Sequence, residues 1–573
     1  MIFGDVTYTQ TVNPTRSLIM IVTKITSSQE KIFADERVVN YPELKKLTAL
    51  KGERVSIQYM FTYEQGGSDM LPGVIRVEPK ITGSLAPYVH SVRDIYQVPV
   101  VKTIRAEIDG NYLRTAPGLF PDVLNPLQYS GKISISPCSL SAVWIEIRLP
   151  EDISAGNYEL KIEIDAEDYG KRENVFTLEV INAMLPVEDI PLWHGFHADC
   201  LANYYRVPVW SDEHWRIVEN FARVAVEYGT NIITLPIVTP PLDTEIGGER
   251  TTVQLIDITR NGDKYEFGFS NLQKWIDICD RVGIKGFAIS PLFTQWGAEH
   301  APKIMATVDG EYKKIFGWET DSESEEYLNF VCLLLKAFVK YMKESASDKV
   351  CIFSISDEPS EENLDKYLKV KNAVKDILEG YTVIDGIWDI SFYERGIIET
   401  PLAATSHIKK FIDSKVQHLW AYYCMAQYIN VSNRFHSMPA WRNRSIGMQL
   451  YKFNIEGFAH WGFNFYNNQL SVDSINPYLE CGANLAFPGG DCFVVYPAHD
   501  GSALTSARLV VFYEALQDIK AMKLCEKYYG HDRVVAEIEA VLGDELTFER
   551  CALSSHEMLL VRERINQLIK KAL

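Results

Sequence analysis

The pattern that most constrains the fold begins at Pro191, where short apolar runs start to alternate with amphipathic segments. In residues 211–229, for example, Trp215, Val218 and Phe221 recur at the spacing of one helix face. Eight such units over about 320 residues match the length of a (β/α)8 TIM barrel. The eight runs are PLWHGFH, NIITLPIV, KGFAISPLF, VCIFSISDEP, TVIDGIWD, VQHLWAYYC, GFAHWGFNFY and CFVVYP.

An open, doubly wound α/β sheet is the alternative fold for the same alternation. That fold usually has a glycine-rich turn after its first strand, and no such turn follows PLWHGFH. We therefore predict a (β/α)8 barrel over residues 186–530, with residues 531–573 forming a C-terminal helical extension packed on it.

The first 185 residues follow a different pattern, in which apolar and polar residues alternate one by one. In residues 143–149, for example, Val, Ile, Ile and Leu alternate with Trp, Glu and Arg. A period of two is typical of antiparallel strands with one buried and one polar face. Turn-forming residues separate these segments, as at 150–152 and 155–157. Residues 1–185 are therefore predicted to form a β-sandwich domain.

Composition limits the partners and the compartment. The chain has 57 Lys and Arg against 76 Asp and Glu, so its formal net charge is −19, which argues against nucleic acid as a partner. No apolar stretch approaches the roughly 20 residues needed to span a bilayer, and the start MIFGDVTYTQTVNPTR does not resemble a signal peptide. The ten cysteines, from Cys138 to Cys551, form no CxxC pair. We expect a cytoplasmic location, although a chain that had lost its signal peptide would look the same.

In a TIM barrel the functional residues lie where the strands end and the βα loops begin. The polar and aromatic residues that end or follow the predicted strands are therefore the candidates for a site. They are His197, Asp199, Asp357, Glu358, Trp388, Asp389, Tyr422, Tyr423, Trp461, Asn464 and Tyr466.

The acidic pair Asp357 and Glu358, within Ser356-Asp-Glu-Pro359 at the end of the fourth run, is the sharpest of these candidates. Small polar residues that lead to a carboxylate are typical of the inner wall of a barrel near its mouth. The alternative is a helix cap, because a proline and acidic residues suit the first turn of the helix that follows. The predicted place at the carboxyl end of a barrel strand favours the catalytic interpretation.

A glycosidase needs a carboxyl group that protonates the leaving oxygen and a second group that stabilises the oxocarbenium-like transition state. Barrel glycosidases with a covalent nucleophile typically have Asn-Glu-Pro at the fourth strand and a second Glu after the seventh. Here Asp357 replaces the Asn, and the run GFAHWGFNFY, taken as the seventh, has no carboxylate at its end; Glu456 lies at the wrong end. The expected covalent nucleophile is missing.

One mechanism needs no nucleophile from the protein. The 2-acetamido oxygen of the substrate attacks the anomeric carbon and forms a cyclic oxazoline, as in glycosidases that are exceptions to the two-carboxylate scheme. Asp357 is then the residue that orients and polarises the acetamide N–H, and Glu358 is the general acid/base. A negative Asp357 also favours a protonated Glu358 until the acid acts.

The chain resembles glycoside hydrolase family 123, the β-N-acetylgalactosaminidases. The resemblance rests on Ser356-Asp357-Glu358-Pro359, on IEGFAHWGFNFYN, and on GGDCFVVYP with SARLVVFYEALQDIKAM, and it extends over the barrel and the preceding sandwich. It implies removal of terminal β-linked N-acetylgalactosamine from glycans, including glycosphingolipid head groups. The acidic pair of the family corresponds to Asp357 and Glu358.

Other residues at the strand ends are predicted to bind the sugar. Trp388, Tyr422, Tyr423 and Trp461 are candidates for aromatic walls. Alternation allows only one of the two tyrosines to point inward, and that one is the candidate for holding the acetamide oxygen. Asn464 and His197 are candidates for hydrogen bonds to sugar hydroxyls. For each of these residues the alternative is core packing or ordering of a loop.

No cofactor and no metal are expected. His194 and His197 have no third ligand at motif spacing, and the sequence contains no HExxH, P-loop, GxGxxG or GxSxG motif. Two other hypotheses stay open. One is a glycosidase of other specificity, for β-GlcNAc or a neutral sugar, inverting or covalent, with Asp389 or Asp199 as the partner carboxylate. The other is a non-catalytic carbohydrate-binding protein. Oligomeric state is left open.

Overall fold

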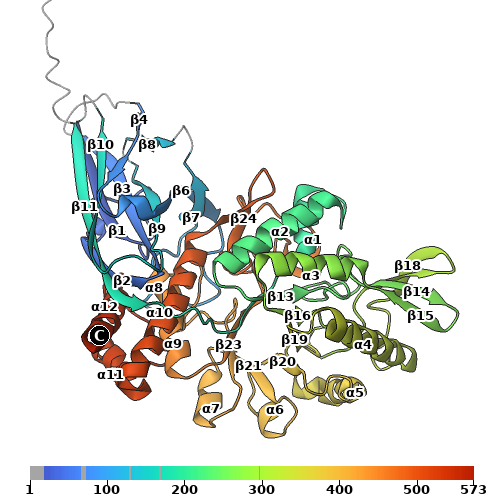
Figure 1. Cartoon of the computed structure of the whole chain (residues 1–573). Coiled ribbons are helices and arrows are strands. Elements are labelled where there is room, and N and C mark those ends of the chain that lie inside the picture. Colours follow the sequence, from blue (N-terminus) through green and yellow to red (C-terminus); the bar gives the residue numbers. More distant parts are fainter. Residues whose placement is uncertain (1–18, 66–72, 128–130, 138, 167–169, 296) are drawn as a thin grey trace, which may run out of the picture. The chain divides into compact units, whose positions relative to one another are not determined.

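The computed structural model describes residues 19–65, 73–127, 131–137, 139–166, 170–295 and 297–573 (Figure 1). The initial segment MIFGDVTYTQTVNPTR and Cys138 lie outside the described residues. The chain divides into two compact units, one made of Met1–Ile95 with Leu124–Met184 and the other of Tyr96–Val123 with Leu185–Leu573. Residues 96–123 therefore belong with the second unit, although they precede the boundary at 185 drawn from the sequence.

The strands of the predicted β-sandwich lie mostly in the first unit, whereas β6 and β7 extend into residues 96–123. A five-stranded sheet has the order β1-β3-β9-β6-β7, and a four-stranded sheet has the order β2-β11-β10-β5, with β4 and β8 paired separately. Neighbours whose register is known run antiparallel, except for the parallel pair β2 and β11. The bounds are β1 Ile19–Ser27, β2 Lys46–Lys51, β3 Arg54–Gln65, β4 Ile75–Val77, β5 Lys80–Thr82, β6 Val89–Val100, β7 Gly118–Pro126, β8 Ile133–Ile135, β9 Ser141–Arg148, β10 Gly156–Asp165 and β11 Lys171–Met184, with short 3-10 turns at Val38–Asn40 and Ala86–Tyr88.

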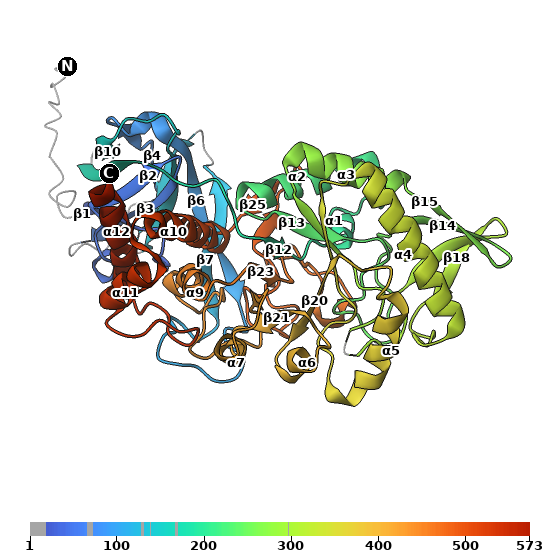
Figure 2. The ribbon, with the colours of Figure 1, turned by 60° about the horizontal axis from the view of Figure 1, so that its bottom comes forward.

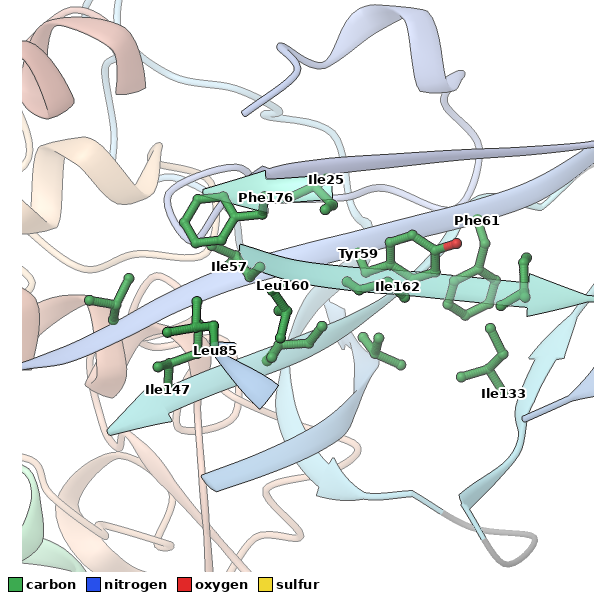
Figure 3. Close-up of a cluster of buried hydrophobic side chains, with 14 of the residues drawn as sticks. Ile25, Ile57, Tyr59, Phe61, Leu85, Ile133, Ile147, Leu160, Ile162 and Phe176 are labelled. Atoms are coloured by element: carbon green, nitrogen blue, oxygen red, sulfur yellow. The ribbon is translucent and has the colours of Figure 1, made fainter. Parts of the chain in front are cut away.

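The core of this unit is formed by the alternating apolar residues of both sheets. Ile57 and Ile147 from the first sheet and Leu160 and Phe176 from the second lie in one buried cluster (Figure 3). Burial of these side chains contributes roughly 1.5–3 kcal/mol for each large apolar group. The cluster is the reason that the period-two pattern of the sequence folds as a sandwich.

The prediction of one polar face is wrong for the central strands of the five-stranded sheet. Trp144 and Glu146 of β9 are also buried. A second apolar cluster, in which Val38 and Tyr41 pack with Met60 of β3, covers this other face. Glu146 is kept there by ion pairs with Arg93 and Arg148 (2.7 Å each). A strand covered on both faces buries its polar residues too, and these then need partners.

The second unit contains a closed barrel of eight strands, which confirms the predicted TIM barrel. All eight neighbouring pairs are parallel. Its interior is filled by inward residues such as Ile232, Ile352 and Ile384. In order, the strands are β12 Leu192–His194, β13 Ile232–Leu235, β16 Gly286–Ile289, β19 Val350–Phe353, β20 Thr382–Ile387, β21 Thr400–Ala404, β22 Trp420–Tyr422 and β23 Gly457–His460.

Helices follow the strands and surround the barrel (Figure 2). The predicted helix at 211–229 is present as α2, which buries Trp215, Val218 and Phe221 and begins at the N-cap Ser211. The helices are α1 Ala198–Tyr205, α2 Asp212–Glu227, α3 Ser270–Val282, α4 Glu325–Ser345, α5 Leu364–Val374, α6 Ser391–Glu394, α7 Ile408–Asp413, α8 Ala440–Arg444, α9 Ile446–Lys452, α10 Ala507–Tyr529, α11 His531–Leu542 and α12 Ser555–Ala572, with 3-10 turns at Glu361–Asn363 and Gln469–Ser471.

Two strand assignments from the sequence are corrected. The sixth strand, β21, was not predicted, because it is short, contains Pro401 and has small residues at Ala403 and Ala404. As a result VQHLWAYYC contains the seventh strand and GFAHWGFNFY the eighth. The run CFVVYP lies outside the barrel: its β24 (Val495–Pro497) pairs with β25 (Ala503–Thr505) in a two-stranded sheet.

Two βα loops carry an additional small sheet that the sequence did not predict. β14 (Asp257–Asn261) and β15 (Lys264–Gly268) follow β13, whereas β17 (Ile304–Val308) and β18 (Glu311–Phe316) follow β16. They pair in the order β15-β14-β17-β18 and project from the barrel (Figure 1).

The chain ends in the predicted helices. α12 contacts α8, α10 and α11, and α10, α11 and α12 lie side by side in both views (Figure 2). Among the described residues, no helix combines the length and the apolar character required to cross a bilayer.

Candidate active site

The acidic pair follows the fourth barrel strand, as expected. β19 ends at Phe353, and the irregular segment 354–360 carries Asp357 and Glu358 at the carboxyl end of the barrel. Ser356 anchors this segment, because its buried hydroxyl donates to the Thr294 carbonyl (2.9 Å) and accepts from Gly297 N–H (3.3 Å). Glu358 has a left-handed backbone (φ 48°), which costs a non-glycine residue about 1–3 kcal/mol. Strain of this kind often occurs at functional sites.

The structure does not support a helix-cap role for the pair. The N-cap of the next helical turn is Ser360, which forms a capping box with Asn363. Pro359 therefore precedes the N-cap and is not in the first turn, contrary to the expectation from the sequence. This capping box satisfies the N–H groups of Ser360 and Asn363 without either carboxylate of the pair.

Tyr422 and Gly386 complete the surroundings of the pair. The Tyr422 hydroxyl, at the end of β22, donates to Glu358 Oε1 (3.0 Å). A Cβ placed on Gly386 of β20 would lie 3.4 Å from Asp357 Oδ1 and 4.0 Å from both Glu358 Cγ and Tyr422 Cε1. Three strands thus bring these four residues together, and the missing side chain at 386 leaves space beside the carboxylates.

The two adjacent tyrosines point in opposite directions, as their alternation predicts. Tyr422 is partly exposed and reaches the acidic pair, whereas Tyr423 is 1% exposed and its hydroxyl donates to Asn443 Oδ1 (3.1 Å). Tyr422 is therefore the tyrosine at the site, and Tyr423 packs behind the strand.

Burial raises the pKa of Asp357, and the neighbouring charges of Glu358 and Asp385 raise it further. Two carboxyl groups this close share protons as one system. We therefore expect the pair to hold one proton near neutral pH. Burial and the charge of Glu358 also raise the pKa of Tyr422, so its hydroxyl stays protonated and acts as a donor.

The stretch after the strand that is actually seventh also lacks a carboxylate. From Tyr423, directly after β22, to Ile455, the sequence contains no Asp or Glu. The corrected strand count therefore does not change the argument against a covalent nucleophile from the protein, because no carboxylate follows β22 before Glu456.

The other carboxylates suggested as partners are engaged elsewhere. Both oxygens of the buried Asp199 accept from Arg250 (2.7 and 3.1 Å). Asp389 Oδ1 accepts from the N–H of Ser391 at the start of α6 (3.0 Å). These contacts give both side chains structural roles in their loops.

His197 and Asn464 are placed in a buried network rather than at an open surface. His197 Nδ1 accepts from Arg250 (2.9 Å), and its Nε2 donates to the Trp461 carbonyl (2.9 Å). Burial, with the charge of Arg250, lowers the pKa of His197 to about 4, so the ring is neutral. Asn464 exchanges two hydrogen bonds with the backbone of His197 (2.9 and 3.0 Å). Both side chains tie the first βα loop to the eighth.

The tryptophans differ in their accessibility. Trp388, just after β20, is 50% exposed and lies near the ring of His407. Trp461, just after β23, is partly buried and its indole N–H donates to Asp491 Oδ2 (3.1 Å). Tyr466 is fully buried and donates to the Val495 carbonyl (2.8 Å). Among these aromatic residues, Trp388 presents the most open face at the mouth.

Sequence reasoning missed Gly386 and Asp385, both on β20. Asp385 contacts the segment that leads to the acidic pair through Ser354 and Ile355. The signal was an acidic residue and a glycine inside the apolar strand TVIDGIWD. Within the described part of the barrel mouth, no three His, Cys, Asp or Glu side chains converge at metal-ligand distance.

A closed (β/α)8 barrel with carboxylates at the carboxyl end of its strands is an architecture that many glycosidases share. The model of the catalytic domain of glycoside hydrolase 123 matches residues 193–525, more than half of the chain. The chain belongs to glycoside hydrolase family 123.

Of two solved structures that match the chain, the first superimposes well enough to agree with this fold. A family 123 glycoside hydrolase from Clostridium perfringens that hydrolyses glycolipid glycans superimposes with a TM-score of 0.71 at 16% identity, over 96% of this chain and 98% of that one. A family 39 glycoside hydrolase from Bacteroides cellulosilyticus WH2 matches with a TM-score of 0.32 at 10% identity, over 86% of this chain and 83% of that one. A comparison with curated proteins found no relative.

Proposed function

We propose that the protein is a retaining exo-glycosidase that removes terminal β-linked N-acetylgalactosamine by substrate-assisted catalysis. The observation that carries the proposal is the Asp357–Glu358 pair at the barrel mouth, with no carboxylate after the seventh strand. A retaining reaction then needs its nucleophile from the substrate, and the 2-acetamido oxygen is such a group.

Asp357 is the residue that receives the acetamide N–H. Before substrate binds, its raised pKa favours the protonated form. The hydrogen bond from the incoming N–H stabilises the carboxylate instead, so the shared proton passes to Glu358. Glu358 then protonates the glycosidic oxygen as the acetamide oxygen attacks, and later deprotonates the water that opens the oxazoline. Holding the acetamide in attack geometry contributes about 7–11 kcal/mol.

Tyr422 is the candidate for holding the acetamide. Its hydroxyl already lies 3.0 Å from Glu358 and is a donor. When the proton moves to Glu358, that carboxyl becomes a weaker acceptor, and the hydroxyl can turn to the acetamide oxygen. The open face of Trp388 suits the apolar face of a sugar ring.

The similarity to a solved family 123 enzyme supports the proposed substrate class. The similar Clostridium perfringens enzyme hydrolyses glycolipid glycans, and we propose oligosaccharide or glycosphingolipid glycans as the substrate here. Location in the cytoplasm stays a prediction from the sequence.

The test compares aryl glycosides of β-GalNAc, β-GlcNAc and β-Gal with the purified full chain. We expect turnover of the β-GalNAc glycoside at least 100-fold above that of β-Gal, which has no acetamide group. Proton NMR of the first product should show the β-anomer. Equal turnover of β-Gal would refute substrate assistance, and an α-anomeric first product would indicate an inverting enzyme.

A further inference from the structure

Asp385 is a buried carboxylate next to the catalytic segment that the mechanism above does not use. It lies on β20 beside Gly386 and is 2% exposed. Its Oδ1 accepts from the Ser354 hydroxyl (2.6 Å) and from Ile355 N–H (3.0 Å), and its Oδ2 accepts from the Tyr367 hydroxyl of α5 (2.6 Å). Because successive strand residues face opposite sides, Asp385 lies behind the wall that Gly386 forms at the site.

The position of these contacts in the sheet is specific. The register between β19 and β20 pairs Ile352 with Thr382 and Phe353 with Val383, where β19 ends. Beyond that point Asp385 supplies the acceptor for Ile355 N–H that a neighbouring strand would supply in a longer ladder. A side chain, rather than the sheet, therefore holds the segment that leads into Asp357 and Glu358.

A carboxylate in such a place is unusual for structure alone. No Lys or Arg among the described residues forms an ion pair with Asp385. Burial accordingly raises the pKa of Asp385 to about 6, although the hydrogen bonds from Ser354 and Tyr367 oppose the rise. A neutral acceptor would hold the loop at lower desolvation cost.

We propose that Asp385 is a positioning residue that fixes the Ser354–Ser356 segment, and through it the acidic pair, while its negative charge acts on that pair from behind the strand. This inference rests on the proposed function for the roles of Asp357 and Glu358. It goes beyond that function by assigning part of their geometry and proton affinity to a residue that does not touch substrate.

The charges around the pair define the expected pH effect. The charge of Asp385 acts on the pair from behind β20, Tyr422 contacts Glu358 from the end of β22, and Cys424 follows that strand. From α5, Tyr367 and Lys371 face Asp385 itself. Of these groups, Asp385 is the one that adds negative charge near the pair above about pH 6. Its charge should raise the pH at which the pair loses its last proton.

The decisive variant is Asp385→Asn, which keeps the shape and leaves an oxygen to accept from Ile355 N–H, but removes the charge. The basic limb of the kcat/KM profile should move to lower pH by about half a unit to one unit. Asp385→Ala removes the acceptors as well, and kcat should fall about 10–100-fold with a much smaller change in KM. The matched control is Asp376→Asn, which changes an exposed acid just after α5. It should change neither the pH of the basic limb nor kcat.

These measurements use the sugar that the wild type turns over fastest, as the glycoside of a weakly acidic phenol whose departure needs protonation. If the wild type turned over the glycoside without an acetamide group equally fast, substrate assistance would be refuted. The effects of the Asp385 variants could still be measured on that glycoside. An unshifted basic limb in Asp385→Asn together with wild-type kcat in Asp385→Ala would overturn the positioning role. If Asp385→Ala does not fold, Tyr367→Phe replaces it, with an expected fall in kcat of about 3–10-fold; wild-type kcat there would also overturn the role.

Discussion

At the scale of single residues, the two adjacent carboxylates have different neighbours. Asp357 lies next to Gly386 of β20, where the proposed mechanism places the acetamide. Glu358 accepts a hydrogen bond from the Tyr422 hydroxyl at the end of β22. Neighbouring residues of an extended segment face opposite sides, so a turn of the backbone is what brings both Asp357 and Glu358 near Gly386. The left-handed conformation of Glu358 supplies that turn.

The first prediction distinguishes the two roles by leaving group. Glu358→Gln should lose about 100–10,000-fold in kcat on natural glycans, because their leaving oxygen needs protonation, and much less on aryl glycosides with acidic phenols. Asp357→Asn should reduce kcat on all substrates, since it acts on the attacking acetamide. Steady-state kinetics on both kinds of substrate measure this. Full activity of Asp357→Asn would contradict the assignment, and Glu361→Gln, an exposed acid three residues on, is the control.

The second prediction concerns the space beside the pair. A methyl group on Gly386 would sit 3.4 Å from Asp357 Oδ1, which is ordinary contact for the protein itself. Gly386→Ala should therefore change the melting temperature little but fill space that the substrate needs. We expect kcat/KM to fall about 10–100-fold. Unchanged kcat/KM would show that the substrate does not approach this strand.

At the scale of elements, the βα loops are held by buried polar groups more than by the sheet. Arg250 is an example: it bonds both oxygens of Asp199 and Nδ1 of His197, and so joins the loop after β13 to the start of α1. Asp385 does the same for the loop after β19. Such contacts fix loops whose backbone leaves the ladder.

The third prediction tests the Arg250 network. Arg250→Met leaves Asp199 buried without its partner, and the free energy of unfolding should fall by about 3–5 kcal/mol. Denaturant unfolding followed by circular dichroism measures the change. Arg223→Met is the matched control, because it removes an exposed helical ion pair with Glu219 and should cost less than about 1 kcal/mol. Equal losses in both variants would show that the buried network is not specially stabilising.

At the scale of the whole molecule, buried carboxylates of two kinds set the dependence of stability on pH. Burial and neighbouring charges raise the pKa of Asp357 from its ordinary value of 3.8 to about 8, and burial raises the pKa of Asp491 to about 7. For Asp199 and Asp122, burial opposes ionisation, but Arg250 and Arg508 outweigh it and hold both pKa values below the ordinary range.

The fourth prediction follows from these signs. A raised pKa means that the folded chain binds the proton more tightly than the unfolded chain, so stability falls as pH rises from about 4 to 8. A lowered pKa gives stability that is present above about pH 4 and is lost as the pH falls further. Buried histidines work in the opposite sense, because the lowered pKa values of His194 (about 3) and His197 (about 4) add stability as the pH rises towards 6.5. They offset the carboxylates in that range, so the melting temperature should be highest near pH 6.5 and decrease towards pH 8.

Calorimetry across pH 4–9 measures this, and Asp357→Asn should flatten part of the decrease. Asp376→Asn should leave the profile as in the wild type. A melting temperature that rises from pH 6.5 to pH 8 would contradict the pKa directions of Asp357 and Asp491.

The sequence predicted what depends on local pattern. The apolar periods of 2 and 3.6 fixed a sandwich followed by a barrel, because a strand or helix must bury its apolar face whatever its neighbours are. The acidic pair was found for the same reason, since its place after an apolar run implies the carboxyl end of a strand. The prediction that no carboxylate follows the seventh strand did not depend on the correct strand count, because the whole stretch from Tyr423 to Ile455 has no acidic residue.

What only the tertiary structure decided depends on contacts between distant segments. β21 is a strand because β20 and β22 pair with it on both sides, and not because of its own residues. His197 and Asn464 are 267 positions apart and share a hydrogen-bonded pair, which no local pattern reveals. Gly386 and Asp385 gain their importance from the loop after β19, about 30 residues earlier. Local sequence determines which elements form, whereas side-chain roles at the site are set by which loops the closed barrel brings together.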